Sequence, residues 1–315
     1  MNEERQQFIV EIQSLIFNDQ FDEADSVSLM RCQADPSDPT PFLFRATALM
    51  ARMAAEEENS DGQLLKELLD SVDVLTALWI DSSDANTSAW MCLYRGHTRA
   101  YRSLWESRFG SFFSAVRIGL SSSGEYQKGF DYDSHLVDLY AGLGAYHYWK
   151  SAKAGFLRWI GVFKNEKKKG LDELYLAADS SVVHRESARS SLIWIWFDQK
   201  QYDSAVAIAR EFITAYPDGT TFYWPVAQAF YKQERYDSAV FAFEQIRSRL
   251  TKRPGNFFNL IECDYHIAKC YSWLSSDEGL DTTVQRFLGY REKIPKATRK
   301  KQRSKVLYLE RLSKR

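Results

Sequence analysis

The residues best suited to metal chemistry are two cysteines and a histidine late in the chain. Cys263, His266 and Cys270 are spaced i, i+3 and i+7, so on a helix all three would lie on one face. Thiolates and imidazoles are zinc ligands, but a structural zinc site takes four ligands and no fourth is spaced nearby. Small apolar cysteines fit a packed helix equally well. We therefore expect no metal site and no cofactor.

A second candidate site is basic. Four lysines follow an apolar stretch that contains Trp159 and Phe163: Lys164, Lys167, Lys168 and Lys169. With the basic C-terminal tail, this 164–169 loop could contact phosphate groups, so nucleic-acid or anionic-surface binding is the alternative function. A lysine run is more often a solvated surface, and we do not expect nucleic acid to be the partner.

Enzyme signatures are absent from the sequence. It contains no GxSxG, HExxH, P-loop or GxGxxG motif, and its five histidines are scattered without a matching motif context. We therefore expect a protein without catalytic activity.

Charge is balanced overall but unevenly distributed. The 315 residues include 41 Lys and Arg against 42 Asp and Glu, yet the first 90 residues are strongly acidic and the last 25 strongly basic. The sequence contains no run of 18 apolar residues that could form a transmembrane segment. Its acidic start is typical of an amphipathic helix. We expect a cytoplasmic protein as written, or a periplasmic one if the natural precursor carries an export signal.

The elements that must position any site are repeated helical hairpins. The five residues Tyr-Asp-Ser-Ala-Val occur at 202–206 and again at 236–240, an interval of 34. Small and aromatic residues follow each copy at i, i+4 and i+7, which places them on one helical face: Ala205, Ala209 and Phe212, then Ala239, Phe243 and Ile246. The pattern predicts two hairpins of the same kind.

Further copies extend the repeat toward both ends. Ile267 and Ala268 mark a later helix, and Leu143 and Gly144 an earlier one that precedes an inserted segment at 152–170. Alternating strand patterns are scarce, so the fold class is all-α. Hairpins that cannot bury their apolar faces alone must stack, which predicts an α-solenoid, a right-handed superhelix with a concave groove.

These repeats resemble the tetratricopeptide repeat (TPR) family, and the wider pattern is similar to a group of largely uncharacterised bacterial TPR proteins. The resemblance implies a non-catalytic scaffold or adaptor whose first helices line a groove that binds a peptide or a partner helix. Residues on those helices that fall off the buried stripe are the candidate groove residues: Tyr148, Trp149, Trp194, Phe197, Trp224, Gln228, Tyr231, Lys232, Tyr265 and Lys269.

Three regions follow from this pattern. Residues 1–130 form irregular TPR-like hairpins, residues 131–290 hold the TPR repeats with the insertion, and residues 291–315 form a basic C-terminal capping helix. The expected partner is a protein or peptide. Solenoid ends can pair, which allows a homodimer.

Overall fold

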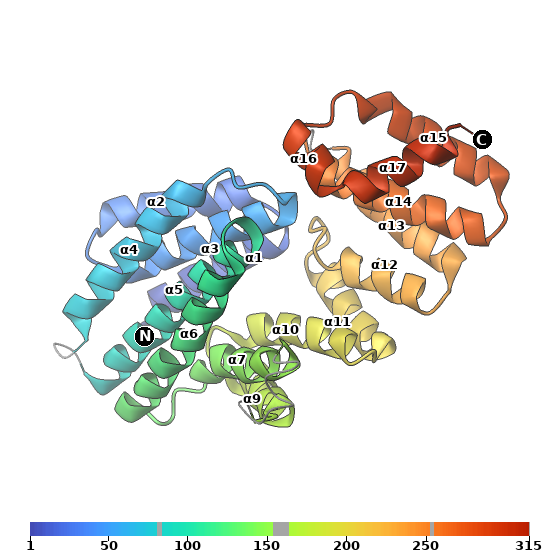
Figure 1. The fold of residues 1–315 in the computed structure, drawn as a ribbon. Helices are drawn as coiled ribbons and strands as arrows, with labels where there is room; N and C mark the ends of the chain where they lie inside the picture. Colours follow the sequence, from blue (N-terminus) through green and yellow to red (C-terminus); the bar gives the residue numbers. More distant parts are fainter. Residues whose placement is uncertain (81–83, 154–163, 253–254, 315) are drawn as a thin grey trace. The chain divides into compact units, whose positions relative to one another are not determined.

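The computed structural model describes residues 1–80, 84–153, 164–252 and 255–314, and all regular structure within them is helical (Figure 1). The predicted fold class, an all-α solenoid of helical hairpins, is confirmed. Most of the 152–170 insertion, from 154 to 163, lies outside the described residues. None of the described helices is long and apolar enough to cross a bilayer.

The chain divides into two compact units. Unit 1 comprises Met1–Ala54 and Glu58–Ile195, and unit 2 comprises Ala55–Glu57 and Trp196–Arg315. This division near residue 195 is not among the boundaries expected from the sequence.

Unit 1 is built from pairs of antiparallel helices. Its helices are α1 (Glu3–Phe17), α2 (Phe21–Ala34), α3 (Pro39–Glu56), α4 (Gly62–Trp79), α5 (Ala85–Phe109), α6 (Phe112–Tyr132), α7 (Leu139–Lys153) and α9 (Lys167–Ser180). Helix α10 (Arg185–Asp198) begins in unit 1 and ends in unit 2.

Unit 2 continues the hairpin pattern and ends in two short helices. Its helices are α11 (Tyr202–Ala215), α12 (Tyr223–Lys232), α13 (Tyr236–Leu250), α14 (Phe257–Trp273), α15 (Asp277–Arg291), α16 (Lys296–Lys301) and α17 (Arg303–Leu312). Both Tyr-Asp-Ser-Ala-Val copies begin a second helix of a hairpin, as the 34-residue interval predicts. The small and aromatic residues that follow each copy are at most 1% exposed.

Four hairpins also share a turn of the same conformation, although no glycine in the sequence marks it. Asp19, Lys200, Glu234 and Ser275 all have positive φ, between 54° and 61°, although none is glycine. After each of them, the next backbone N–H donates to a carbonyl five residues earlier, for example Gln201 to Trp196 and Arg235 to Phe230, both at 2.9 Å. This left-handed helix ending satisfies carbonyls that the first helix leaves free. It marks the hairpins α1–α2, α10–α11, α12–α13 and α14–α15 as equivalent.

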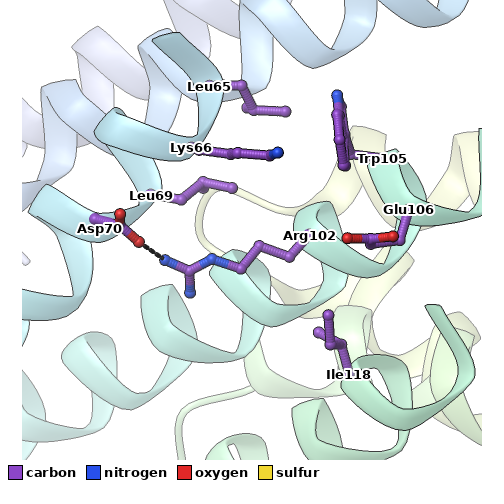
Figure 2. A pocket seen from close by; sticks show the side chains of 8 residues that line it. All are labelled: Leu65, Lys66, Leu69, Asp70, Arg102, Trp105, Glu106 and Ile118. Atoms are coloured by element: carbon purple, nitrogen blue, oxygen red, sulfur yellow. Dashed lines mark hydrogen bonds and ion pairs between the residues drawn. The ribbon is translucent and has the colours of Figure 1, made fainter. Parts of the chain in front are cut away.

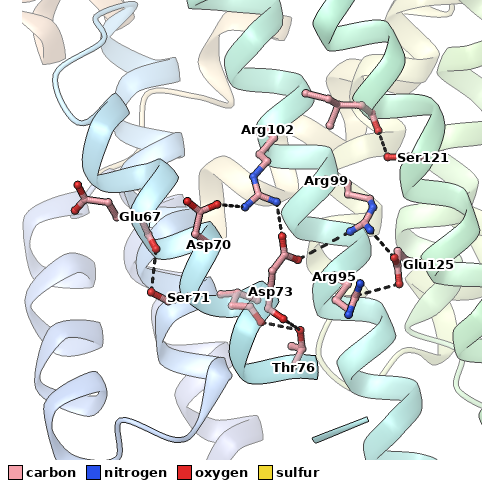
Figure 3. A network of polar contacts seen from close by, with 12 residues as sticks. Glu67, Asp70, Ser71, Asp73, Thr76, Arg95, Arg99, Arg102, Ser121 and Glu125 are labelled. Atoms are coloured by element: carbon pink, nitrogen blue, oxygen red, sulfur yellow. Dashed lines mark hydrogen bonds and ion pairs between the residues drawn. The ribbon is translucent and has the colours of Figure 1, made fainter. Parts of the chain in front are cut away.

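The α5–α6 hairpin is longer than its neighbours and is joined to α4 by charged side chains (Figure 3). Arg102 of α5 contacts Asp70 and Asp73 of α4, each at 2.6 Å. One helical turn away, Arg99 contacts Glu125 of α6 at 2.7 Å. This row of ion pairs aligns three helices in a region where the repeat pattern is weak.

Candidate functional site

The predicted groove residues fall in both units and have different environments. In unit 1, Tyr148 is fully buried, and its hydroxyl donates to the carbonyl of Ile195 at 3.5 Å. The prediction that Tyr148 faces a partner is therefore wrong. It fails because α7 and α9 approach closely at two glycines, Gly144 and Gly170, which draws the Tyr148 backbone into the interface.

The two predicted groove tryptophans of unit 1 are accessible to different degrees. Trp149 is half-buried with the Lys153 ammonium 5.3 Å from its ring centre, and Trp194 is 40% exposed. Phe197, at the end of α10, packs against Tyr202 at 5.1 Å. Tyr148 and Trp194 thus belong to unit 1 and Phe197 to unit 2.

In unit 2, the predicted residues of α12 and α14 meet around one histidine. His266 of α14 lies against Tyr231 of α12 at 4.8 Å and against Tyr265 at 5.2 Å between ring centres. Gln228 Nε2 is 3.3 Å from His266 Nε2. Phe243 of α13 stacks on the same imidazole at 4.8 Å with nearly parallel planes, and Trp224 packs edge-on against Phe243.

These contacts belong to a continuous line of rings, which we call the aromatic row. It runs through Trp273, Tyr236, Tyr231, His266, Tyr265 and Tyr308, with neighbouring ring centres 4.8 to 6.2 Å apart. Four helices, α12, α13, α14 and α17, contribute to it. Trp273 at one end is 65% exposed, and the tyrosines are half-buried. The row therefore presents ring edges and faces to solvent over several turns of helix.

Lysines accompany the row. Lys269 Nζ lies 5.9 Å from the ring centre of Tyr265 and 5.3 Å from that of Tyr308. Lys232 is exposed at the end of α12, and Lys305 of α17 pairs with Glu262. The pKa of His266 is lowered to about 4, mainly by burial; Glu262 opposes this lowering and the three lysines add to it. At neutral pH the imidazole is uncharged, so the positive charge of the row comes from its lysines.

Sequence reasoning missed several members of the row. Tyr308 and Lys305 belong to the C-terminal helix, for which the sequence predicts a basic cap or, as the alternative, an anion-binding tail. Tyr236 opens a Tyr-Asp-Ser-Ala-Val copy and was read as part of the repeat. His266 was considered only as a metal ligand. Most of these contacts join residues from different helices, so no periodicity within one helix signals them.

The cysteines beside His266 do not suit a metal. Cys263 and Cys270 are fully buried, and burial raises the pKa of Cys263 well above its usual value and that of Cys270 to about 12. A cysteine binds zinc as the thiolate, and this buried environment disfavours the thiolate. Within the described residues, no three His, Cys, Asp or Glu side chains are grouped to hold a metal ion.

The lysines of the predicted 164–169 loop make contacts within unit 1, and Lys167, Lys168 and Lys169 begin helix α9 and do not lie in a loop. Lys168 pairs with Asp172 at 2.8 Å, Lys169 lies 3.8 Å from Glu173, and Lys167 lies over the Tyr148 ring at 5.1 Å. These contacts offset part of the positive charge that an anionic partner would need. Trp159 and Phe163 lie outside the described residues.

Unit 1 contains a shallow pocket of about 200 Å³ between α4, α5 and α6 (Figure 2). Leu65, Leu69 and Ile118 form its apolar wall, and the Lys66 ammonium lies 4.0 Å from the centre of the Trp105 ring. Asp70 and Arg102 pair with each other at 2.6 Å. Glu106 accepts a hydrogen bond from the Ser111 backbone at 2.8 Å. Most of its polar groups thus already have partners.

A buried chain of hydrogen bonds links four side chains of unit 1. Asp138 accepts from the backbone of Val182, Val183 and His184 and from His184 Nδ1, all at 2.9 to 3.0 Å. His184 Nε2 lies 3.1 Å from His97 Nε2, and His97 Nδ1 lies 3.0 Å from the Tyr126 hydroxyl. His184 Nδ1 donates to the Asp138 carboxylate. When His184 is neutral its Nε2 accepts from His97, whose Nδ1 then accepts from Tyr126, and when His184 is protonated both bonds run the other way.

No family model and no curated protein matches this sequence. A crystal structure of the C-terminal part of a TPR repeat-containing protein from Cytophaga hutchinsonii is similar over 92% of this chain and 97% of that one. The TM-score is 0.47 and the sequence identity 15%.

Proposed function

We propose that this protein is a non-catalytic interaction scaffold that binds a polypeptide across the aromatic row of unit 2. One observation carries the proposal: predicted residues from α12 and α14 converge with α17 on a single accessible line of rings. Large rings bury much apolar area on binding and lose little conformational freedom, which is why tyrosine and tryptophan dominate the energetics of protein interfaces.

The row is built to hold its shape before a partner arrives. The fully buried Phe243 ring stacks on the His266 ring, and Trp224 packs edge-on against Phe243. The Tyr308 hydroxyl lies 3.3 Å from Ser272 Oγ, which ties α17 to α14. A preorganised surface loses less side-chain entropy on binding than a mobile one.

Selection of peptides from a random 12-residue display library tests the proposal. Binding of the selected peptides is compared between the native chain and a Tyr231→Ala/Tyr265→Ala variant. Each truncation removes about 1 to 2 kcal/mol of contact, so the double variant should bind at least tenfold more weakly.

Two exposed aromatic residues supply a matched pair for the same assay. Trp273 is 65% exposed and belongs to the row, whereas Phe241 is 68% exposed on α13 and does not. Trp273→Ala should weaken binding and Phe241→Ala should leave it unchanged. Equal affinity of the selected peptides for the native chain and the Tyr231→Ala/Tyr265→Ala variant would show that the row is not the binding surface.

A further inference from the structure

Two of the three lysines at the aromatic row, Lys232 and Lys269, have no carboxylate partner among the described residues. Elsewhere Arg247 pairs with Asp264 at 2.7 Å, and Arg286 pairs with Glu244 at 2.7 Å. At the row, Lys305 is matched by Glu262, which also accepts from Gln302 at 2.8 Å. Among the described residues, no carboxylate lies within ion-pair distance of Lys232 or Lys269.

Lys232 and Lys269 both lie at the aromatic row. Lys269 Nζ lies 5.9 Å from the ring centre of Tyr265 and 5.3 Å from that of Tyr308, and Lys232 directly follows Tyr231 at the end of α12. The charges of both lysines also contribute to the lowered pKa of His266. The uncharged imidazole contributes no further charge at neutral pH. Two lysines without a carboxylate partner thus lie beside half-buried aromatic rings.

From this arrangement we propose that the partner segment is acidic, with Asp or Glu side chains that pair with Lys232 and Lys269 while its apolar side chains lie on the rings. This inference rests on the proposed function and specifies its partner chemistry. Complementary charge at an interface speeds association and selects among partners, and its effect weakens as salt rises.

Ring orientation favours a polypeptide over single-stranded nucleic acid. Proteins that bind single strands offer free ring faces on which bases stack. Here Tyr231 and Tyr265 each meet His266 at an interplanar angle of 76°, and Tyr265 meets Tyr308 at 74°. Lys269 lies near the rings of both Tyr265 and Tyr308. Tyr236 and Trp273, at one end of the row, are stacked at 8°. At the centre of the row, however, the rings contact one another edge to face with a lysine beside them, which suits carboxylates and aliphatic side chains better than stacked bases.

Three labelled 12-residue peptides test the proposal on the full-length protein. They share Leu and Phe at the same positions and carry Glu, Gln or Lys at all others. Fluorescence anisotropy at 50 and 200 mM NaCl should show the Glu peptide binding about tenfold more tightly than the Gln peptide at low salt, with a smaller difference at high salt. A labelled oligouridine of the same length is measured in parallel.

Charge reversal is the decisive variant. In Lys232→Glu/Lys269→Glu the preference should invert, so that the Lys peptide binds more tightly than the Glu peptide. Lys293→Glu/Lys300→Glu changes the net charge equally at exposed positions of unit 2 outside the row and should keep the preference for Glu. Circular dichroism confirms that both variants stay folded.

The remaining outcomes separate this inference from the proposed function. If the Glu and Gln peptides bind equally and both are lost in Tyr231→Ala/Tyr265→Ala, the acidic partner is wrong and the binding surface stands. If no peptide depends on the row, both proposals are wrong. If oligouridine binds more tightly than the Glu peptide and charge reversal removes it, the partner is a nucleic acid and the inference is overturned.

Discussion

At the scale of single residues, the buried chain from Asp138 to Tyr126 shows how a solenoid can hold polar groups in its interior. Asp138 is fully buried. Burial alone would raise its pKa, but the hydrogen bond and charge of His184 and the backbone donors hold it below the usual value. Every polar atom along the chain has a partner, so the penalty for an unsatisfied buried group is avoided. The chain joins α5 and α6 to the segments that precede α7 and α10.

This chain predicts that unit 1 is sensitive to acid. Burial, reinforced by His184, lowers the pKa of His97 to about 3 from its usual 6.5. Between these values the unfolded chain binds a proton that the folded chain excludes, so stability is full above pH 6.5 and falls as the pH drops toward 3. The loss should reach about 1.4 kcal/mol per pH unit from this imidazole.

Urea unfolding of the full chain at several pH values between 7 and 4 measures this loss. Hydrogen exchange in α5 serves as the probe of unfolding in unit 1. His97→Gln should be less stable at pH 7 but should depend less on pH. His135→Gln, which alters an exposed histidine of the same unit, should keep the native pH profile. An unchanged slope in His97→Gln would mean that another group controls the acid response.

At the scale of elements, the spacing between helices depends on where glycine stands. A methyl group at Gly170 would lie 2.6 Å from the Gly144 carbonyl oxygen and from the Tyr148 amide nitrogen, so α7 and α9 would have to separate. Gly124 on α6 is exposed, and nothing lies within 4 Å of the position that its Cβ would take.

The two glycines make a matched pair for thermal unfolding. Gly170→Ala should destabilise unit 1 by about 2 kcal/mol or more, because the overlap is with backbone that cannot rotate away. Gly124→Ala should be neutral or stabilise by up to about 1 kcal/mol, since alanine is the better helix former. Equal effects at both positions would argue against close packing of α7 and α9.

Helix α17 has two roles, because it caps the stacked hairpins and also contributes to the aromatic row. Val306 and Leu309 are buried against a cluster that includes Ile261 and Phe287, which covers the end of the stacked hairpins. Its other side supplies Tyr308 and Lys305 to the aromatic row. The cap and the candidate surface therefore depend on the same ten residues, Arg303–Leu312.

At the scale of the whole molecule, the division into two compact units predicts that damage to one leaves the other folded. Leu309 is fully buried in unit 2, and Leu309→Ala removes its side chain at an expected loss of about 2 to 5 kcal/mol. Hydrogen exchange measured by mass spectrometry on the full chain should show faster exchange in α14 to α17 and no change in α1 to α9. Uniformly faster exchange would show that both units unfold as one.

Much of the architecture could be predicted because hairpin packing is a local property. Ala205 and Ala239 must be small wherever a second helix crosses the first, and the 34-residue interval records that requirement in the sequence. The candidate surface was predicted in part. Tyr231, Tyr265 and Lys269 could be found because they lie off the buried stripe of their own helices. Tyr148 follows the same rule and is buried, because its exposure depends on a neighbouring helix.

The sequence by itself determined the all-α class, the hairpin repeat and the stripe of residues that each hairpin buries, since these follow from helical periodicity within some 34 residues. Tertiary structure alone decided which rings share a surface, which lysines keep an unmatched charge, and that His97 meets His184 across 87 positions. These features depend on distances between helices from different hairpins, and no short-range pattern of residue types encodes such distances.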